Sequence, residues 1–130
     1  MSQENVEVVR ALLDAWNRDD ETALLACLVL DVVWIAARSD TEGAFYGHEG
    51  MRRFRLDTFE NFEMFEPRFE LRDLDQRVLA WGTIRVRGRG SGIEMDVPGG
   101  GVFELRDRKI VRFENHSGRN EVLQAVGLAE

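Results

Sequence analysis

The first part of the chain carries apolar residues at helical spacing. From Val6 to Trp16 they recur three or four positions apart, which predicts an amphipathic helix over residues 2–18. Asp20 follows a run of turn-forming residues and is a suitable N-cap for a second helix over about 21–29. Because this second segment is apolar nearly all round, we expect it to be packed on more than one side.

The next segments change period twice. The β-branched and aromatic run at 32–35 predicts a strand. Residues 37–47 mix turn-forming side chains with Phe45 and Tyr46, which predicts a loop that turns large apolar groups inward, as loops over pockets do. Helical spacing returns from 48 to about 61 and predicts a third helix.

Beyond Pro67 the pattern becomes an alternation of apolar and polar residues. This period predicts a meander of antiparallel strands, and the chain closes with a predicted helix over 119–126. The sequence therefore predicts an α+β fold, in which a curved antiparallel sheet forms a cone with helices packed on its concave face and a pocket enclosed between them. The four predicted strands span 68–72, 78–87, 93–105 with an interruption or bulge at 98–101, and 110–115.

Composition narrows the class of protein. The 130 residues predict one domain over 1–130, and 44% hydrophobic with 32% charged residues is typical of a globular chain. Seventeen Lys and Arg against 24 Asp and Glu give a net charge of −7, which disfavours nucleic acid and membrane partners. The single cysteine, Cys27, excludes an internal disulfide and favours a reducing cytoplasm, and no secretory signal or membrane span is evident.

The chain shows no pattern for a metal or a cofactor. His48 and His116 are far apart in sequence and no carboxylate cluster accompanies either, so no metal site is predicted. The glycine run at 99–101 lies between two predicted strands, whereas nucleotide-binding glycine motifs open a helix. We therefore expect no cofactor.

Four segments, in this order, resemble a known family. The resemblance covers residues 3–128 and points to the nuclear transport factor 2-like superfamily, most closely its SnoaL-like (polyketide-cyclase-like) branch. The segments are AWNRDD at 15–20, LDVVW at 30–34, YGHEG at 46–50 and LRDRKIVRF at 105–113.

The resemblance implies a cone-shaped α+β fold, a homodimer formed through the outer face of the sheet, and a deep pocket between sheet and helices. It does not imply one activity. The superfamily includes ketosteroid isomerases, polyketide cyclases, a dehydratase, an epoxide hydrolase and transport factors, so the chemistry must be argued from the residues of the site.

Two of these activities lack their residues here. Ketosteroid isomerase chemistry uses a carboxylate base with an oxyanion hole of a tyrosine and a protonated aspartate, which its apolar site keeps neutral. By register those positions fall on Leu12, about Ala36 and about Gly101. The Arg-x-Asp pair of the epoxide hydrolases would fall near 81–83 and is absent. An enzyme would then be a cofactor-independent isomerase, cyclase or dehydratase that uses other residues.

Strand alternation predicts an apolar pocket with one polar side chain. Asn115 is that polar group, and two roles are open for it: orienting a ligand carbonyl or hydroxyl, or satisfying a neighbouring backbone group. For Trp16 and Trp34 a plain core role is the alternative to lining the pocket. The predicted lining residues are Leu12, Trp16, Trp34, Phe69, Ala80, Gly82, Ile84, Gly101, Phe103, Phe113 and Asn115.

The two histidines and one tryptophan carry the remaining predictions. His48 precedes the third helix, where it either acts as an acid or base in the pocket or caps the helix or bonds a loop carbonyl. The alternation places His116 on the outer face of the last strand, as a rim or dimer contact. Trp81 and Arg85 share the face away from the helices, so we predict an exposed Trp81 in a dimer interface.

Three functions remain open from the sequence. The first is a domain that binds a hydrophobic small molecule in an apolar pocket. The second is a lyase or isomerase that acts on a polyketide- or terpenoid-like substrate by general acid–base catalysis, in which His48 or another pocket group moves a proton and Asn115 orients the substrate oxygen. The third is a non-catalytic dimerisation module whose cavity is incidental, which a cavity filled by Trp16, Trp34 and Phe113 would favour.

Overall fold

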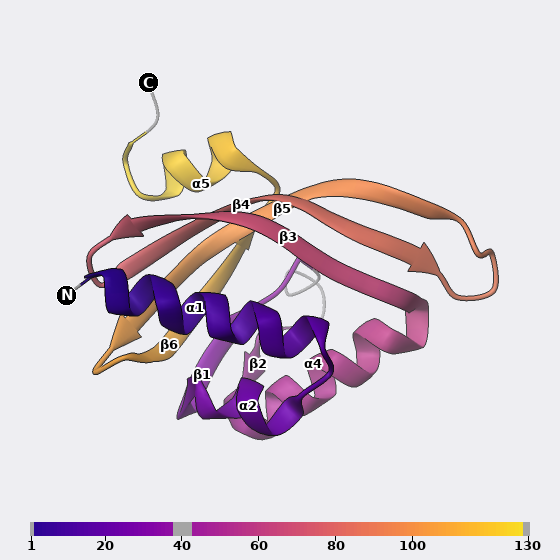
Figure 1. Cartoon of the computed structure of the whole chain (residues 1–130), viewed down its shortest axis with the longest axis horizontal. Coiled ribbons are helices and arrows are strands. Elements are labelled where there is room, and N and C mark those ends of the chain that lie inside the picture. The colour runs from indigo at the N-terminus through magenta and orange to yellow at the C-terminus, as the bar shows by residue number, and fades with distance from the viewer. Residues whose placement is uncertain (1, 38–42, 129–130) are drawn as a thin grey trace.

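A computed structural model describes residues 2–37 and 43–128. The predicted helices and strands occur in the expected order, with one additional short strand, β2 (Phe45–Tyr46). The helices pack on a single six-stranded sheet that curves along its length (Figure 1). The elements are α1 (Ser2–Asn17), α2 (Glu21–Ala26), β1 (Leu28–Ile35), β2 (Phe45–Tyr46), α4 (Gly47–Asn61), β3 (Phe62–Leu74), β4 (Arg77–Gly88), β5 (Glu94–Arg106), β6 (Lys109–His116) and α5 (Arg119–Ala125).

The sheet has the order β2-β1-β6-β5-β4-β3. Strands β3 to β6 form the predicted antiparallel meander, whereas β1 pairs with β6 in parallel. The α+β prediction is confirmed, and the expectation of a fully antiparallel sheet is wrong at this one pair. Strand β2, helix α4 and strands β3 to β5 lie between β1 and β6 along the chain, so no hairpin constrains these two strands to run in opposite directions.

The helices lie on both faces of the sheet. Helices α1, α2 and α4 cover one face and α5 lies on the other (Figure 1). The prediction that all helices pack on the concave face is therefore wrong for α5. Its side chains Val122 and Leu123 are buried against Leu79 and Trp81, which form a second, smaller apolar cluster on the outer face.

The α1–α2 region follows the predicted capping chemistry. The Asp20 carboxylate accepts a hydrogen bond from the Ala23 backbone N–H at 3.1 Å, and this bond lowers the pKa of Asp20. The second helix ends at Ala26 rather than near 29, because Leu28 already pairs with Ile110 at the start of β1. Leu28 and Val29, which the helical pattern included, therefore belong to the strand.

Strand β5 runs unbroken through the glycine run that was expected to interrupt it. Gly100 pairs with Trp81 on one side and His116 on the other. A Cβ atom on Gly100 would lie 2.3 Å from the Ala80 carbonyl oxygen, so a side chain at this position has no room. The glycines let β4 and β5 approach closely rather than breaking the strand.

The segment before α4 differs from the predicted loop. Phe45 and Tyr46 form the short strand β2, which pairs with β1. Phe45 is buried, as expected, but Tyr46 is 66% exposed, so the prediction that both rings turn inward is wrong for Tyr46. Successive side chains of a strand point to opposite faces, which sends only one of the two rings into the core. Residues 38–42 of the predicted loop lie outside the described residues.

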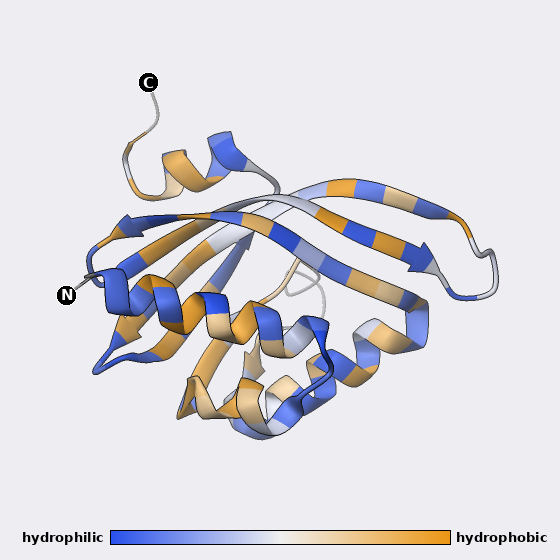
Figure 2. Ribbon diagram, in the orientation of Figure 1, coloured by the Kyte–Doolittle hydropathy of each residue, from blue (hydrophilic) through white to orange (hydrophobic). Residues whose placement is uncertain are grey.

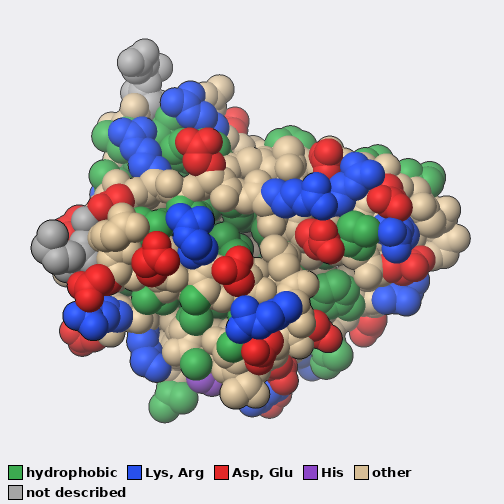
Figure 3. Space-filling model, in the orientation of Figure 1, with side chains coloured by type: hydrophobic (Ala, Val, Ile, Leu, Met, Phe, Trp, Pro, Cys, Tyr) green, Lys and Arg blue, Asp and Glu red, His purple; other side chains and the backbone are tan. Residues whose placement is uncertain are grey.

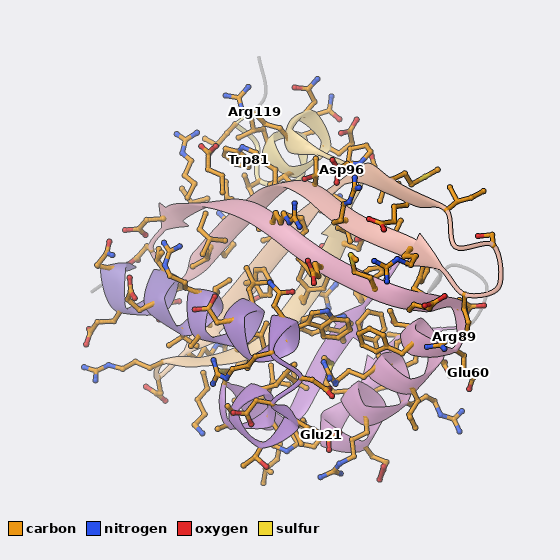
Figure 4. All side chains as sticks on the ribbon, turned by 45° about the vertical axis from the view of Figure 1, so that its right-hand side comes forward. Glu21, Glu60, Trp81, Arg89, Asp96 and Arg119 are labelled. Carbon is orange, nitrogen blue, oxygen red and sulfur yellow. The ribbon has the colours of Figure 1, made fainter. Side chains whose placement is uncertain are left out.

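The main core lies between the inner face of the sheet and helices α1, α2 and α4. Apolar residues of α1 face the strands, as Figure 2 shows by the orange stripe along that helix. The β4–β5 hairpin extends beyond the helices, and Arg89 at its turn donates hydrogen bonds to the carbonyl oxygens of Phe59 at 3.0 Å and Phe62 at 3.5 Å. Figure 4 shows Arg89 beside Glu60 at the end of α4, so the hairpin is attached to this helix terminus.

Candidate functional site

An apolar cavity of about 400 Å³ lies between α1, α4 and the inner face of the sheet. This volume is within the range of sites that hold small molecules. It is lined by Leu12, Leu13, Trp16, Leu24, Trp34, Ala36, Ala37, Met51, Phe54, Thr58, Phe62, Phe65, Pro67, Phe69, Ile84, Val97, Pro98, Gly99, Gly100, Phe103, Phe113, Asn115, His116 and Ser117.

Aromatic rings from three adjacent strands form one wall of the cavity. Trp34 is in register with Phe113, and Phe113 with Phe103, so the three side chains share a face. The Trp34 ring stacks on Phe113 with a centroid distance of 4.3 Å, and Phe103 lies 4.7 Å from Phe113. The pairing register thus fixes this wall as a continuous aromatic surface.

Eight predicted lining residues meet at the cavity, and three do not. Ala80, Gly82 and Gly101 lie in the sheet but outside the lining. A Cβ atom on Gly101 would lie 2.4 Å from the ring atom Cε1 of Phe113, which shows that this ring covers the glycine. Alternation gives the face of a residue, but the neighbouring side chains decide which residues on that face reach the cavity. The eight are Leu12, Trp16, Trp34, Phe69, Ile84, Phe103, Phe113 and Asn115.

Most polar residues of the cavity lining are consecutive in the sequence. Asn115, His116 and Ser117 follow one another where β6 ends, and the other polar lining residue, Thr58, donates its hydroxyl hydrogen to the Phe54 carbonyl at 2.8 Å. Among the described residues the Asn115 side chain makes no hydrogen bond. The Nε1–H of Trp34 is buried and likewise has no partner there.

His48 lies outside the cavity. Its Nε2 atom is 3.2 Å from the Leu28 carbonyl oxygen, and its ring lines a separate surface depression with Leu25 and Lys109. This contact agrees with the structural role that the sequence left open for His48, a hydrogen bond to a backbone carbonyl. His48 is therefore not placed to act on a molecule in the cavity, and the acid–base hypothesis would need another group of the cavity lining.

His116 combines an outer-face register with a place at the rim of the cavity. It pairs with Gly100, which pairs with Trp81, and residues in register share a face, so His116 is on the outer side of the sheet. Its Nε2 atom is buried without a hydrogen-bond partner in the described structure, at 3.9 Å from Glu114 Oε2, which exceeds hydrogen-bond distance. The chain at this residue forms part of the cavity rim.

Trp81 is on the predicted face but is not exposed. Only 9% of the residue is accessible, because α5 packs over it and the Arg119 guanidinium lies 5.5 Å from its ring centroid (Figure 4). The prediction of an exposed Trp81 is wrong. Arg85, further along the same strand, donates to Glu94 at 3.1 Å and lies 3.4 Å from Asp96, so its charge is paired within the chain.

Several cavity residues were not assigned from the sequence. Phe54 and Phe65 contact Trp16 with centroid distances of 5.6 and 5.8 Å, and both line the cavity. The helical spacing of Met51, Phe54 and Thr58 was a usable signal for the α4 side. For Phe65 there was none, because the strand was expected to begin only after Pro67, whereas β3 begins at Phe62.

The described part of the chain holds neither a cluster of metal-ligating side chains nor a membrane-spanning helix. Residues 2–37 and 43–128 contain no group of three or more His, Cys, Asp or Glu side chains placed to hold a metal ion. In the same residues no helix has the length and apolar character needed to cross a bilayer.

Comparison with known proteins agrees with this geometry. TerC, whose structure was determined with polyporic acid, is similar at 21% identity and a TM-score of 0.80, over 88% of this chain and 91% of TerC. A putative polyketide cyclase from Xanthomonas campestris pv. campestris is similar at 24% identity and a TM-score of 0.79, over 88% of this chain and 90% of that one. These similarities establish the fold alone.

A third structure and a domain family complete the comparison. An NTF2-like protein of unknown function from Burkholderia pseudomallei is similar at 23% identity and a TM-score of 0.79, over 93% of this chain and 95% of that one. No curated protein matches the chain. The SnoaL-like domain matches residues 9–113, which is most of the sequence. The chain therefore belongs to the SnoaL-like family and has the NTF2-like, ketosteroid isomerase-like fold.

Proposed function

We propose that this protein binds a hydrophobic small molecule in the apolar cavity, with an oxygen atom of the ligand directed toward Asn115. The observation that carries the proposal is the cavity itself, about 400 Å³ of space whose described lining contains no Asp, Glu, Lys or Arg side chain. Burial of apolar surface supplies most of the binding free energy in such a site, and a single polar end supplies orientation.

The cavity argues against a module whose interior is filled by side chains. Trp16, Trp34 and Phe113 were the side chains expected to fill it, and all three instead form its walls. Their rings contact one another and their neighbours edge to face or stacked, which holds the walls in place without closing the space. A preformed space reduces the conformational entropy lost when a ligand binds.

Acid–base catalysis is the second candidate, and it is supported only by the polar rim. His116 is the one titratable residue among the described lining residues, and Asn115 beside it has a free amide. With no carboxylate in the cavity, proton transfer would depend on His116, whose side chain is on the outer side of the sheet. The geometry therefore favours binding over turnover.

The relatives agree with a small-molecule ligand. TerC was crystallised with polyporic acid, and a small organic molecule is the class of ligand that an aromatic cavity with one amide accommodates. We carry over only the class of ligand.

A matched pair of ligands tests the proposal. Fluorene and 9-fluorenone have the same ring system and differ by one carbonyl oxygen, so we expect both to bind, measured by isothermal titration, and the ketone to bind more tightly. One added hydrogen bond is worth about 0.5–1.5 kcal/mol, or about 2- to 12-fold in Kd. Asn115→Leu should remove the preference for the ketone while the hydrocarbon still binds.

The matched control is Asn120→Leu, since Asn120 is exposed on α5, away from the cavity. This variant should retain the wild-type preference. Failure of both compounds, and of larger ketones, to bind would overturn the proposal. An unchanged preference in Asn115→Leu would remove this residue from the site.

We further infer a homodimer that forms through the outer face of the sheet, and a cytoplasmic location. The free thiol of Cys27 supports a reducing compartment, and burial raises its pKa.

Because α5 covers Trp81, the surface left for a partner subunit is the hairpin region around Arg85. Native mass spectrometry tests the dimer: a monomer at all concentrations would contradict it, and Arg85→Glu should weaken a dimer of this kind.

A further inference from the structure

A second hollow, independent of the cavity, lies between the end of α1, helix α4 and the start of β3. We call it the α1–α4 groove, and its volume is about 860 Å³. It is lined by Trp16, Asn17, Asp19, Glu21, Arg52, Arg55, Leu56, Phe59, Glu63, Met64, Phe65 and Glu66. Nothing in the proposed function uses it.

A wall of two residues separates the groove from the cavity. Trp16 and Phe65 line both spaces. The indole Nε1–H of Trp16 donates to the Phe65 carbonyl oxygen at 2.8 Å, and the two rings lie 5.8 Å apart in an edge arrangement. Since this hydrogen bond holds the wall closed, a molecule in the groove does not need to enter the cavity.

The floor of the groove contains a buried arginine with one unused donor. Only 8% of the Arg55 side chain is accessible. Its guanidinium lies 4.7 Å from the Trp16 ring centroid and 5.6 Å from that of Phe59, and its Nη2 donates to Asp19. Its Nη1 is buried and has no hydrogen-bond partner among the described residues.

An unpaired buried donor is unfavourable and is rare in folded proteins. Asp19 and the rings of Trp16 and Phe59 contact the guanidinium on its other sides, so Nη1 is the donor that an acceptor atom of a bound molecule can satisfy. A ligand oxygen that approaches from the groove would satisfy it after a small displacement of the surrounding side chains.

The charges around the groove exclude a simple anion. Its lining has two arginines and four carboxylates, and Asp19 already compensates Arg55 while Glu21 lies 3.8 Å from Arg52. Figure 4 shows Glu21 extending from the start of α2 toward α4. Among the described residues Glu63 has no ion-pair partner. The excess of negative charge repels a free anion, and Figure 3 shows acidic and basic side chains interspersed on this face.

The same arrangement disfavours a cation, because the unused Arg55 donor is itself positive. The remaining carboxylate oxygens need hydrogen-bond donors and the arginine needs an acceptor. A neutral group that offers both donors and acceptors meets the two requirements at once. Leu56, which is 68% exposed, and the rings of Phe59 and Trp16 add apolar surface for the C–H groups of such a ligand.

We propose that the α1–α4 groove is a binding site for a neutral polyhydroxylated ligand of the pyranose type, in which one hydroxyl oxygen accepts a hydrogen bond from Arg55 Nη1 and other hydroxyls donate to groove carboxylates such as Glu63. Adjacent hydroxyl groups supply donors and acceptors at close spacing, and the C–H face of a sugar ring packs on apolar side chains.

Three small probes distinguish the charge classes: methyl β-glucopyranoside, acetate and methylammonium. Each is titrated into the isotope-labelled full chain and followed by two-dimensional NMR, with the Trp16 indole N–H as a reporter in the wall of the groove. We expect the glycoside to shift signals of α4, the α1–α2 turn and the start of β3, and the two ions to cause no saturable shift there.

Two variants and one control locate the site. Arg55→Lys keeps the positive charge beside Asp19 but loses the forked donors, so the glycoside should bind about fivefold more weakly, as expected for one hydrogen bond. Glu63→Gln should weaken binding about two- to threefold, because a charge-assisted hydrogen bond becomes a neutral one. Arg53→Lys is the control, because Arg53 is exposed on the same helix and does not line the groove.

The outcomes separate cleanly. Saturable shifts from acetate or methylammonium without shifts from the glycoside would overturn the proposal, as would glycoside shifts confined to cavity residues. Equal glycoside affinity in wild type and a folded Arg55→Lys would also overturn it. If Arg55→Lys fails to fold, the comparison of Glu63→Gln with wild type decides. Because neither fluorene nor its ketone is used, failure here leaves the cavity proposal unaffected.

Discussion

The two faces of the sheet are closed in different ways. On the inner face, Trp34, Phe113 and Phe103 form a row of contacting rings, and the long helices α1 and α4 complete the enclosure while leaving a cavity. On the outer face, Trp81 is covered by α5, which has only seven residues. The inner face thus combines a core with a hollow, whereas the outer face has one small contact cluster and charged residues beyond it.

The two faces differ in how much they contribute to the stability of the whole fold. A helix of seven residues is not stable alone, so α5 depends on its contacts with Leu79 and Trp81. Further along the same face, Arg85 and Arg87 pair with Glu94, which keeps the hairpin polar and neutral. Changes on the inner face should therefore affect the whole fold, and changes on the outer face should remain local.

The largest effect is expected for Phe103→Ala. Phe103 is 1% exposed and lies at the centre of the inner row, so its removal should lower the free energy of unfolding by about 3–5 kcal/mol, as measured by urea denaturation. The matched control is Val102→Ala, the next residue of β5, which is on the opposite face and only partly buried. Similar losses for both variants would contradict the distinction between the faces.

A smaller effect is expected for Val122→Ala, which removes two buried methyl groups between α5 and the sheet. We expect a loss of about 1.5–2.5 kcal/mol, measured for α5 by native-state hydrogen exchange. Exchange should accelerate over α5 and remain unchanged in α1, because local opening of a short helix does not require global unfolding. Acceleration throughout the chain would show that α5 belongs to the global unit.

Arg119→Gln tests the contact above Trp81 and should lower the stability by less than Val122→Ala does. The guanidinium lies 5.5 Å from the ring centroid, and an exposed cation–π contact contributes about 0.5–1 kcal/mol. Thermal denaturation should show a small decrease in Tm and little change in the emission of Trp16 and Trp34. Arg77→Gln, at an exposed arginine of β4, is the control, and an equal decrease there would mean that general charge is responsible.

The smallest effect is expected for Glu94→Gln, and it should depend on pH. Hydrogen bonds from Arg87 and Arg85 lower the pKa of Glu94 in the folded chain. Its contribution is therefore present above the pKa of the unfolded chain and is lost as the pH falls through the lower, folded value. The difference in Tm between wild type and Glu94→Gln should be largest near neutral pH and disappear in acid.

High salt should also reduce that difference, since the pairs are exposed to solvent. Glu70→Gln is the control, because the described structure gives Glu70 no ion pair. A pH-independent difference for Glu94→Gln would mean that packing, rather than charge, is responsible.

Some parts of the candidate site were predictable from spacing. Helical periodicity located α1 with Val9 and Trp16 on its buried face, and alternation placed Phe113 and Asn115 together on the inner face of β6. The prediction that Trp81 is exposed is wrong, because alternation reports only which face of the strand a residue is on. It gives the face of the residue correctly, but whether a helix from the end of the chain covers that face depends on packing across the sheet.

The sequence by itself determined the α+β class, the order of elements and the apolar character of the cavity, because the periods of 3.6 and 2 are local properties of the chain. Only the tertiary structure decided that β1 runs parallel to β6, that His48 lies outside the cavity, and that Arg55 is buried beside Trp16 with a free donor. These features depend on residues far apart in sequence, and their positions are set by the packing of α1 and α4 on the curved sheet.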